Sequence, residues 1–320
     1  MSTVFPIGLC SQTTSGSVSS VGSATQKPNP ALLYVLTLGS DQSRRRVLAS
    51  LNKIATEFGY PDAASCEWER MRFSDINTLK SRWQKANKAP ATINLAVALL
   101  RGVAKQAWLA NLISDKDYMA IIMTKGTRGS RLSHGRALNP SESNLVIQSC
   151  REEDTRIGKR DAAIFALGLG CGLRRNELGT LRLKDVDCSE HSLRILGKGN
   201  KERMAFCPPP VWEIFSEWLD CRGDDGEYVF CHVRKGDKLD PHSELSNIAI
   251  YQMMVRRAAK LHVDLAPHDL RRTFATRLFE MGGDANLVRK AMGHSSIATT
   301  QRYDKRDDKA VQNLVSGLRL

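Results

Sequence analysis

The chain carries side chains of the types that can bind a phosphate and attack it. They are Arg174, Lys198, His268, Arg271, His294 and Tyr303. Guanidinium groups neutralise phosphate oxygens, best as bidentate donors, and a tyrosine hydroxyl can form a covalent phosphoryl intermediate. The set therefore predicts phosphoryl transfer. Because no carboxylate cluster of divalent-metal type accompanies it, we expect neither a metal nor another cofactor.

Two of the segments supply a first arginine and a lysine. In GCGLRRNEL, Arg174 opens a predicted helix, where backbone N–H groups suit a phosphate, and Glu177 lies one turn on and could orient it. In GKGNKER, Lys198 would lie at the tip of a hairpin, where it can donate a proton to a leaving oxygen. Taken alone, the first segment fits a surface salt bridge equally well, and the second fits a solvated turn better.

The other two segments supply the histidines, a second arginine and the tyrosine. His268 and Arg271 in APHDLRRTFATRL share one helix face. In MGHSSIATTQRYDK, His294 falls at a turn and Tyr303 in the next predicted helix. Alone, His268 could cap its helix and Tyr303 could be an ordinary amphipathic tyrosine. The combination is far more specific than any of its parts.

In order, context and spacing, the four segments resemble the active site of tyrosine recombinases, the phage-integrase and Xer-type family. The resemblance is strong over residues 140–320 and weaker over residues 30–123. It implies a DNA recombinase in which Arg174 and Arg271 grip the scissile phosphate. Tyr303 would attack it and leave a 3′-phosphotyrosine and a free 5′ hydroxyl, so that religation needs no ATP.

The resemblance also implies the remaining roles. Lys198 would protonate the departing 5′ oxygen, and His268 would assist proton transfer with the nucleophile. His294 would hydrogen-bond the phosphate, and Glu177 matches the acidic partner of the first arginine. One departure is visible, because Arg272 stands where the family often has a histidine.

Bulk composition agrees with a nucleic-acid partner. The net charge is +13 and the sequence pI about 9.5, which favours a polyanion. No run approaches the roughly 18 apolar residues that span a bilayer. The eight cysteines form no C-x-x-C pair, so we interpret them as reduced, mostly packing thiols. We expect a cytoplasmic protein associated with the bacterial nucleoid and no membrane partner.

Composition and periodicity predict a mainly α protein in four parts. Residues 1–27 are Ser-rich and predict a disordered tail. Residues 28–123 predict a small all-helical domain, and the resemblance implies that it is a DNA-binding, core-binding (SAM-like) domain. Residues 124–138 predict a basic linker. Residues 139–320 predict the catalytic domain, mostly α with a small antiparallel sheet.

Periodicity places the elements of the second domain. We expect a strand–turn–strand between 192 and 207. Helices are expected near 140–151, 157–169, 210–221, 243–262, 268–281, 284–291 and 296–303.

Double-stranded DNA carrying a specific recombination site is the expected partner. Candidate contacts are Arg44, Arg45, Arg46, Arg128 and Arg131. The resemblance implies a homotetramer on two DNA sites, alone or with a related second recombinase. The segment after Tyr303 predicts an amphipathic helix, which in the family docks on a neighbouring protomer but could also pack on its own domain.

Two other functions are consistent with parts of this pattern. A non-enzymatic DNA-binding protein could share the fold, but the intact set of six side chains argues against it. A type IB topoisomerase has related chemistry and would relax DNA without pairing two sites. The two-domain layout and the tail helix favour recombination for integration, excision or resolution, as in a mobile element.

Overall fold

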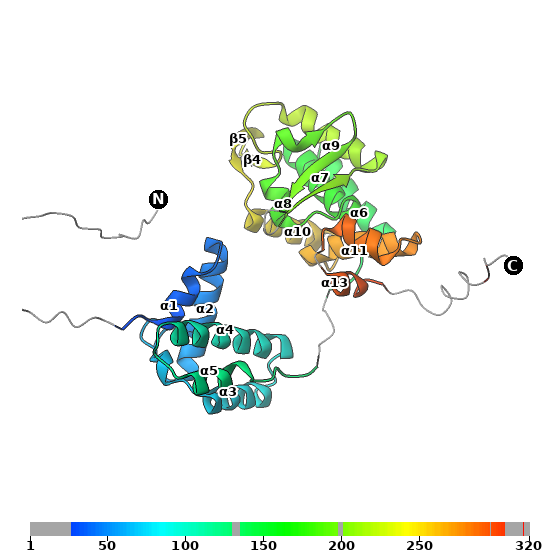
Figure 1. Ribbon diagram of the computed structural model, residues 1–320. Coiled ribbons are helices and arrows are strands. Elements are labelled where there is room, and N and C mark those ends of the chain that lie inside the picture. The colour runs from blue at the N-terminus through cyan, green and yellow to red at the C-terminus, as the bar shows by residue number, and fades with distance from the viewer. Residues whose placement is uncertain (1–26, 130–134, 198–200, 295, 305–315, 317–320) are drawn as a thin grey trace, which may run out of the picture. The chain divides into compact units, whose positions relative to one another are not determined.

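The computed structural model describes residues 27–129, 135–197, 201–294, 296–304 and 316. The chain forms two compact units, Met1–Leu132 and Ser133–Leu320 (Figure 1). Most of the predicted tail, Lys198 and Arg131 lie outside the described residues, as does the amphipathic segment after Asp304 apart from Ser316. The functional assignment of the two units remains a prediction.

The regular elements in the described part of the N-terminal unit are all helices. Its helices are α1 (Pro30–Leu36), α2 (Asp41–Glu57), a 3-10 turn (Trp68–Arg70), α3 (Phe73–Lys85), α4 (Pro90–Leu109) and α5 (Asp115–Ile122). Ser40 caps α2, because its side chain accepts a hydrogen bond from the Ser43 amide. The core lies along α4, and Trp68 is buried with its indole N–H donating to the Ala63 carbonyl at 2.8 Å.

The C-terminal unit combines helices with two small antiparallel sheets. Its helices are α6 (Pro140–Arg151), α7 (Arg156–Gly170), α8 (Arg175–Thr180), α9 (Pro209–Arg222), α10 (Asn247–Lys260), α11 (Pro267–Glu280), α12 (Ala285–Met292) and α13 (Ile297–Gln301). Its strands are β1 (Val186–Asp187), β2 (Ser192–Leu196), β3 (Glu202–Phe206), β4 (Cys231–Arg234) and β5 (Lys238–Glu244). The order β1-β2-β3 forms one sheet and β4-β5 the other.

The predicted fold class, mainly α with a small antiparallel sheet, is confirmed, with two local corrections. The β4-β5 hairpin was not foreseen, and β5 runs through Glu244, so α10 begins later than expected. The strands of the β4-β5 hairpin lack regular alternation of apolar residues, and they pair around a tight turn. Helix α13 ends at Gln301, so Tyr303 lies just beyond it and not within it.

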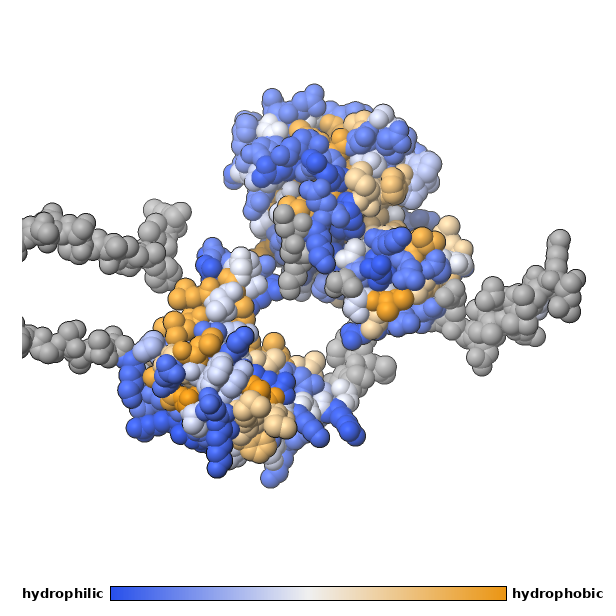
Figure 2. Space-filling view, in the orientation of Figure 1, coloured by the Kyte–Doolittle hydropathy of each residue, from blue (hydrophilic) through white to orange (hydrophobic). Residues whose placement is uncertain are grey.

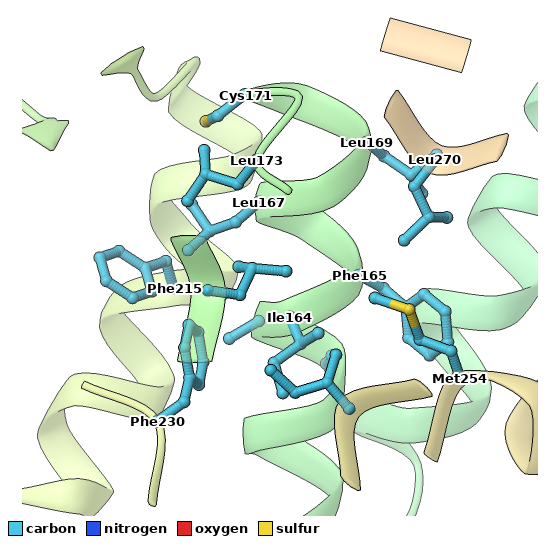
Figure 3. Close-up of a cluster of buried hydrophobic side chains, with 14 of the residues drawn as sticks. Ile164, Phe165, Leu167, Leu169, Cys171, Leu173, Phe215, Phe230, Met254 and Leu270 are labelled. Carbon is cyan, nitrogen blue, oxygen red and sulfur yellow. The ribbon is translucent and has the colours of Figure 1, made fainter. Parts of the chain in front are cut away.

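Helix α7 forms the centre of the C-terminal unit. Its residues from Arg160 to Leu169 are all buried, so the helix is enclosed on every side. Figure 3 shows Phe165 and Leu167 of this helix among side chains from other elements, including Phe215 of α9 and Leu270 of α11. Because α11 packs against α7, the rigid core fixes the helix that carries His268 and Arg271.

A buried ion network ties α7 to α10. Asp161 is fully buried and accepts hydrogen bonds from Arg160 at 2.8 Å and from Arg257 at 2.9 Å. Arg257 also donates to Glu153, at 2.9 Å from Nη2. Removing one member of such a network leaves an uncompensated charge and costs about 3–5 kcal/mol.

The visible surface of the C-terminal unit is largely polar (Figure 2), and the described cysteines are unpaired thiols. Figure 2 shows hydrophilic side chains over most of the visible face of the C-terminal unit. The seven described cysteines are free, and five of them are buried. None of the helices in the described ranges is both long and apolar enough to span a bilayer.

Candidate active site

A buried carboxylate organises the first arginine. Arg174 is the N-cap of α8, and its amide donates to Glu177 Oε2 at 2.9 Å while its Nη1 donates to Glu177 Oε1 at 2.6 Å. Arg203 of β3 binds the same carboxylate, with Nη1 at 3.0 Å from Oε1 and Nη2 at 2.9 Å from Oε2. The Glu177 side chain is 3 % exposed, so one buried anion holds two guanidiniums.

Glu177 stays ionised in spite of its burial. Burial raises the pKa of its carboxyl, but hydrogen bonds and charges from Arg203 and Arg174 outweigh this and leave the pKa below its ordinary value. The carboxylate can therefore orient Arg174 at neutral pH, as the sequence suggested.

The second arginine reaches the same place from α11. Arg271 is 5 % exposed and donates from Nη1 to the Gly172 carbonyl and from Nη2 to the Met292 carbonyl. Gly172 has a φ of +63°, a left-handed conformation that favours glycine. Burial and the charge of Arg174 lower the pKa of Arg271 to about 9, so its guanidinium is still mainly protonated at neutral pH.

Both arginines converge on the turn that follows α12. Arg174 Nη2 lies 3.4 Å from the Gly293 carbonyl, next to the Met292 carbonyl that accepts from Arg271. Gly293 ends α12 in a left-handed conformation with a φ of +59°, and His294 follows it. Segments far apart in the chain are thus brought to one turn.

His294 is held by the short helix after this turn. Its Nδ1 lies 2.9 Å from Oγ1 of Thr300, which is fully buried. Partial burial and the charges of Arg271 and Arg174 lower the pKa of His294 to about 4. The imidazole is therefore neutral at pH 7.

Tyr303 lies beside His294 and is half-buried. The two rings are 6.1 Å apart between centroids and inclined by 24°. The Tyr303 ring packs against the small cluster formed by Ala275, Phe279, Val288 and Met292. Arg272, the departure from the family pattern, places its guanidinium carbon 5.9 Å from the centroid of the Tyr303 ring. This distance is compatible with a cation–π contact.

His268 lies near the start of α11 and remains exposed. Desolvation and the charges of Arg175 and Arg271 lower the pKa of His268. It therefore feels the same positive field as His294, although the described contacts do not join it to the Met292–Gly293 turn.

The structure accordingly brings together Arg174, Glu177, Arg271, His294 and Tyr303, with His268 nearby. Lys198 lies outside the described residues. Of the candidate DNA contacts, Arg45, Arg46 and Arg128 are exposed, whereas Arg44 donates to the Leu38 carbonyl at 3.0 Å and pairs with Asp41.

Sequence reasoning missed Arg203. Its position held a usable signal, because Arg203 and the buried Ala205 are two residues apart on β3 and so face the same side. A charge on the inner face of a strand requires a buried counterion, which Glu177 supplies.

Comparison with known proteins assigns the family. The model of the phage integrase family matches residues 136–310. The chain belongs to the phage integrase family. The resemblance predicted from the four segments is thus confirmed, and with it the enzyme class of tyrosine-type site-specific DNA recombinases.

Curated relatives in this family include two XerC tyrosine recombinases. That of Actinobacillus pleuropneumoniae serotype 7 (strain AP76) is 30 % identical over 242 residues, covering 73 % of this chain and 76 % of that protein. That of Alcanivorax borkumensis is 29 % identical over 257 residues, covering 78 % and 80 %.

Two solved structures share the fold of this chain. The Tn1549 transposon integrase, solved with transposon right end DNA, has a TM-score of 0.65 at 17 % identity, covering 91 % of this chain and 100 % of that one. A lambda integrase dimer bound to a COC′ core site has a TM-score of 0.64 at 16 % identity, covering 88 % and 93 %.

Proposed function

We propose that this recombinase cuts and rejoins DNA at a specific site through a 3′-phosphotyrosine formed on Tyr303. The observation that carries the proposal is the convergence of both arginines on the Met292–Gly293 turn, with His294 and Tyr303 directly after it. Two guanidiniums and a neutral imidazole around one point form a site for a phosphodiester, and the phenol beside them is the nucleophile.

The proposed reaction begins when the Tyr303 oxygen attacks phosphorus. Arg174 and Arg271 neutralise the non-bridging oxygens as negative charge grows on them. The P–O5′ bond breaks, the 5′ oxygen takes a proton from Lys198, and the Tyr303 phenol gives its proton to the imidazole of His268. The phosphotyrosine keeps the energy of the phosphodiester, so that a 5′ hydroxyl from another strand can attack it and restore the chain.

The neutral His294 imidazole can donate one hydrogen bond to the phosphate. A neutral imidazole has one N–H and one acceptor nitrogen. If Nδ1 accepts from the Thr300 hydroxyl, Nε2 carries the proton and can donate it in a hydrogen bond to a phosphate oxygen. Thr300 would thereby set the tautomer of His294.

The proposed partner is double-stranded DNA bearing a recombination site, held by both units. The relatives are named tyrosine recombinases, and several structural neighbours were solved with DNA. In this proposal the N-terminal unit is the core-binding domain, with Arg44, Arg45 and Arg46 near the backbone of the duplex. The exposed Arg128 contacts the DNA from within the linker. The active assembly is a homotetramer on two sites, acting on a mobile element in the cytoplasm.

A nicked DNA duplex tests the chemistry. Cleavage next to the nick releases a short fragment, so the covalent complex accumulates and survives denaturing electrophoresis. We expect an adduct with wild type and none with Tyr303→Phe. Tyr228→Phe is the matched control, because Tyr228 lies in the same unit with its ring near Arg182. The substrates are duplexes copied from the DNA on either side of the gene, including any inverted repeats found there, and a scrambled duplex of equal length.

Three outcomes contradict the proposal. If wild type forms no adduct on any of the flanking duplexes, the proposed covalent cleavage is contradicted. If an adduct still forms with Tyr303→Phe, the nucleophile is a residue other than Tyr303. Equal cleavage of the scrambled duplex, with relaxation of supercoiled DNA, replaces recombination with a topoisomerase activity.

A further inference from the structure

Arg203 connects three elements of the site through one guanidinium. From β3 it binds both oxygens of Glu177 on α8, at 3.0 and 2.9 Å, and its Nε lies 3.4 Å from the Ala291 carbonyl on α12. It also packs on the turn after α12, because a Cβ added to Gly293 would lie 2.7 Å from Arg203 Cδ. Its side chain is 10 % exposed, so these contacts are largely removed from water.

Arg203 and Arg174 share Glu177 unequally. Arg203 forms the two-pronged pair that a guanidinium and a carboxylate prefer. The Arg174 guanidinium is bonded to Oε1, while Oε2 accepts the Arg174 backbone amide. Since a guanidinium has five N–H donors, this arrangement leaves Arg174 donors to offer to a phosphate.

Removing Arg203 would change this balance. Glu177 would then face one cation inside a poorly solvated pocket, and the two-pronged pairing would become open to Arg174. If the Arg174 guanidinium rotated to form this pair with Glu177, its N–H groups would no longer point toward the phosphate position or the Gly293 carbonyl. The charge of Arg203 also helps to keep Glu177 ionised.

We infer that Arg203 is a positioning residue, which occupies Glu177 so that Arg174 stays turned toward the scissile phosphate. This inference rests on the proposed function of the site. It assigns Arg203 no contact with DNA. Arg203 affects cleavage only by orienting Arg174, so its loss should have no effect when Arg174 is absent.

Single-turnover cleavage of the nicked duplex, with protein in saturating excess, measures the effect. We expect Arg203→Met to cleave about 100-fold more slowly, as a small misplacement of a catalytic group can cause. DNA affinity should change by less than about threefold, since Arg174 is one of many phosphate contacts. Arg194→Met is the matched control on the adjacent strand β2, where Arg194 pairs with Asp185 at 2.7 Å. It should cleave at the wild-type rate.

A double-mutant cycle separates positioning from general weakening of the fold. If Arg203 acts through Arg174, Arg203→Met in an Arg174→Ala background causes no further loss of rate. Multiplicative losses in the double variant would overturn the inference, as would wild-type cleavage by Arg203→Met. Thermal unfolding confirms that each variant is folded at the assay temperature.

A conservative variant keeps the test decisive if Arg203→Met does not fold. Arg203→Lys retains the charge but loses the two-pronged pair, so we expect a loss of about 10-fold, which again disappears in the Arg174→Ala background. Failure of the proposed function is recognised separately, because wild type would then form no adduct. Failure of this inference alone leaves the wild-type adduct intact.

Discussion

Replacing Glu177 with glutamine tests how much the buried carboxylate stabilises the C-terminal unit. The carboxylate accepts four hydrogen bonds, two from Arg174 and two from Arg203. Each carboxylate oxygen accepts from two donors. Glutamine keeps one acceptor oxygen but replaces the other with an NH2 group, which faces two N–H donors, so about two charged hydrogen bonds are lost. At about 1.5–3 kcal/mol each, and in line with about 3–5 kcal/mol for breaking a buried ion pair, we expect a loss near 3–5 kcal/mol.

Thermal unfolding of the full chain at pH 7 measures this loss. For a unit of this size, about 2–4 °C per kcal/mol predicts a melting temperature lower by roughly 6–20 °C. Asp185→Asn is the control, since Asp185 pairs with Arg194, and their side chains are 19 % and 49 % exposed, against 3 % for Glu177. That variant should lose no more than about 1 kcal/mol.

The pH dependence sharpens the test. The pKa of Glu177 is below its ordinary 4.5 in the folded chain, so its stabilisation is complete above that value and is lost as pH falls through the folded pKa. The gap between wild type and Glu177→Gln should therefore narrow in acid. A glutamine variant that melts within about 2 °C of wild type at pH 7, or a gap that widens in acid, would refute the reasoning.

Three further predictions concern neighbouring contacts. Thr300→Val should slow cleavage about 10-fold while leaving DNA affinity unchanged, because it frees the His294 imidazole; unaltered single-turnover rates would contradict the role of Thr300. Asp161→Asn should cost about 3–5 kcal/mol in chemical denaturation, because it strips two arginines of a buried partner, and a change under 1 kcal/mol would count against it. Because the pKa of His294 is lowered, the free energy of unfolding should fall as the pH drops from 6.5 toward 4. His294→Asn should reduce this pH dependence. An unchanged dependence would mean that another group causes it.

The sequence alone determined the residue types, their order and the family. Arg174, His268, Arg271, His294 and Tyr303 stand in local patterns that are read directly from the chain. Helix periodicity also acts over a few residues, and it predicted most helices of the C-terminal unit within about a turn. Such features depend on near neighbours, which the sequence displays.

Only the tertiary structure decided which of these side chains share one point. The Glu177–Arg203 pair, the carbonyls that Arg271 binds and the position of Arg272 over the Tyr303 ring join residues from separate elements. Their meeting depends on how α11 packs on α7 and how β3 and α12 approach α8, and periodicity does not encode these approaches. The β4-β5 hairpin was missed for a related reason, since strand pairing depends on a partner strand more than on intrinsic preference.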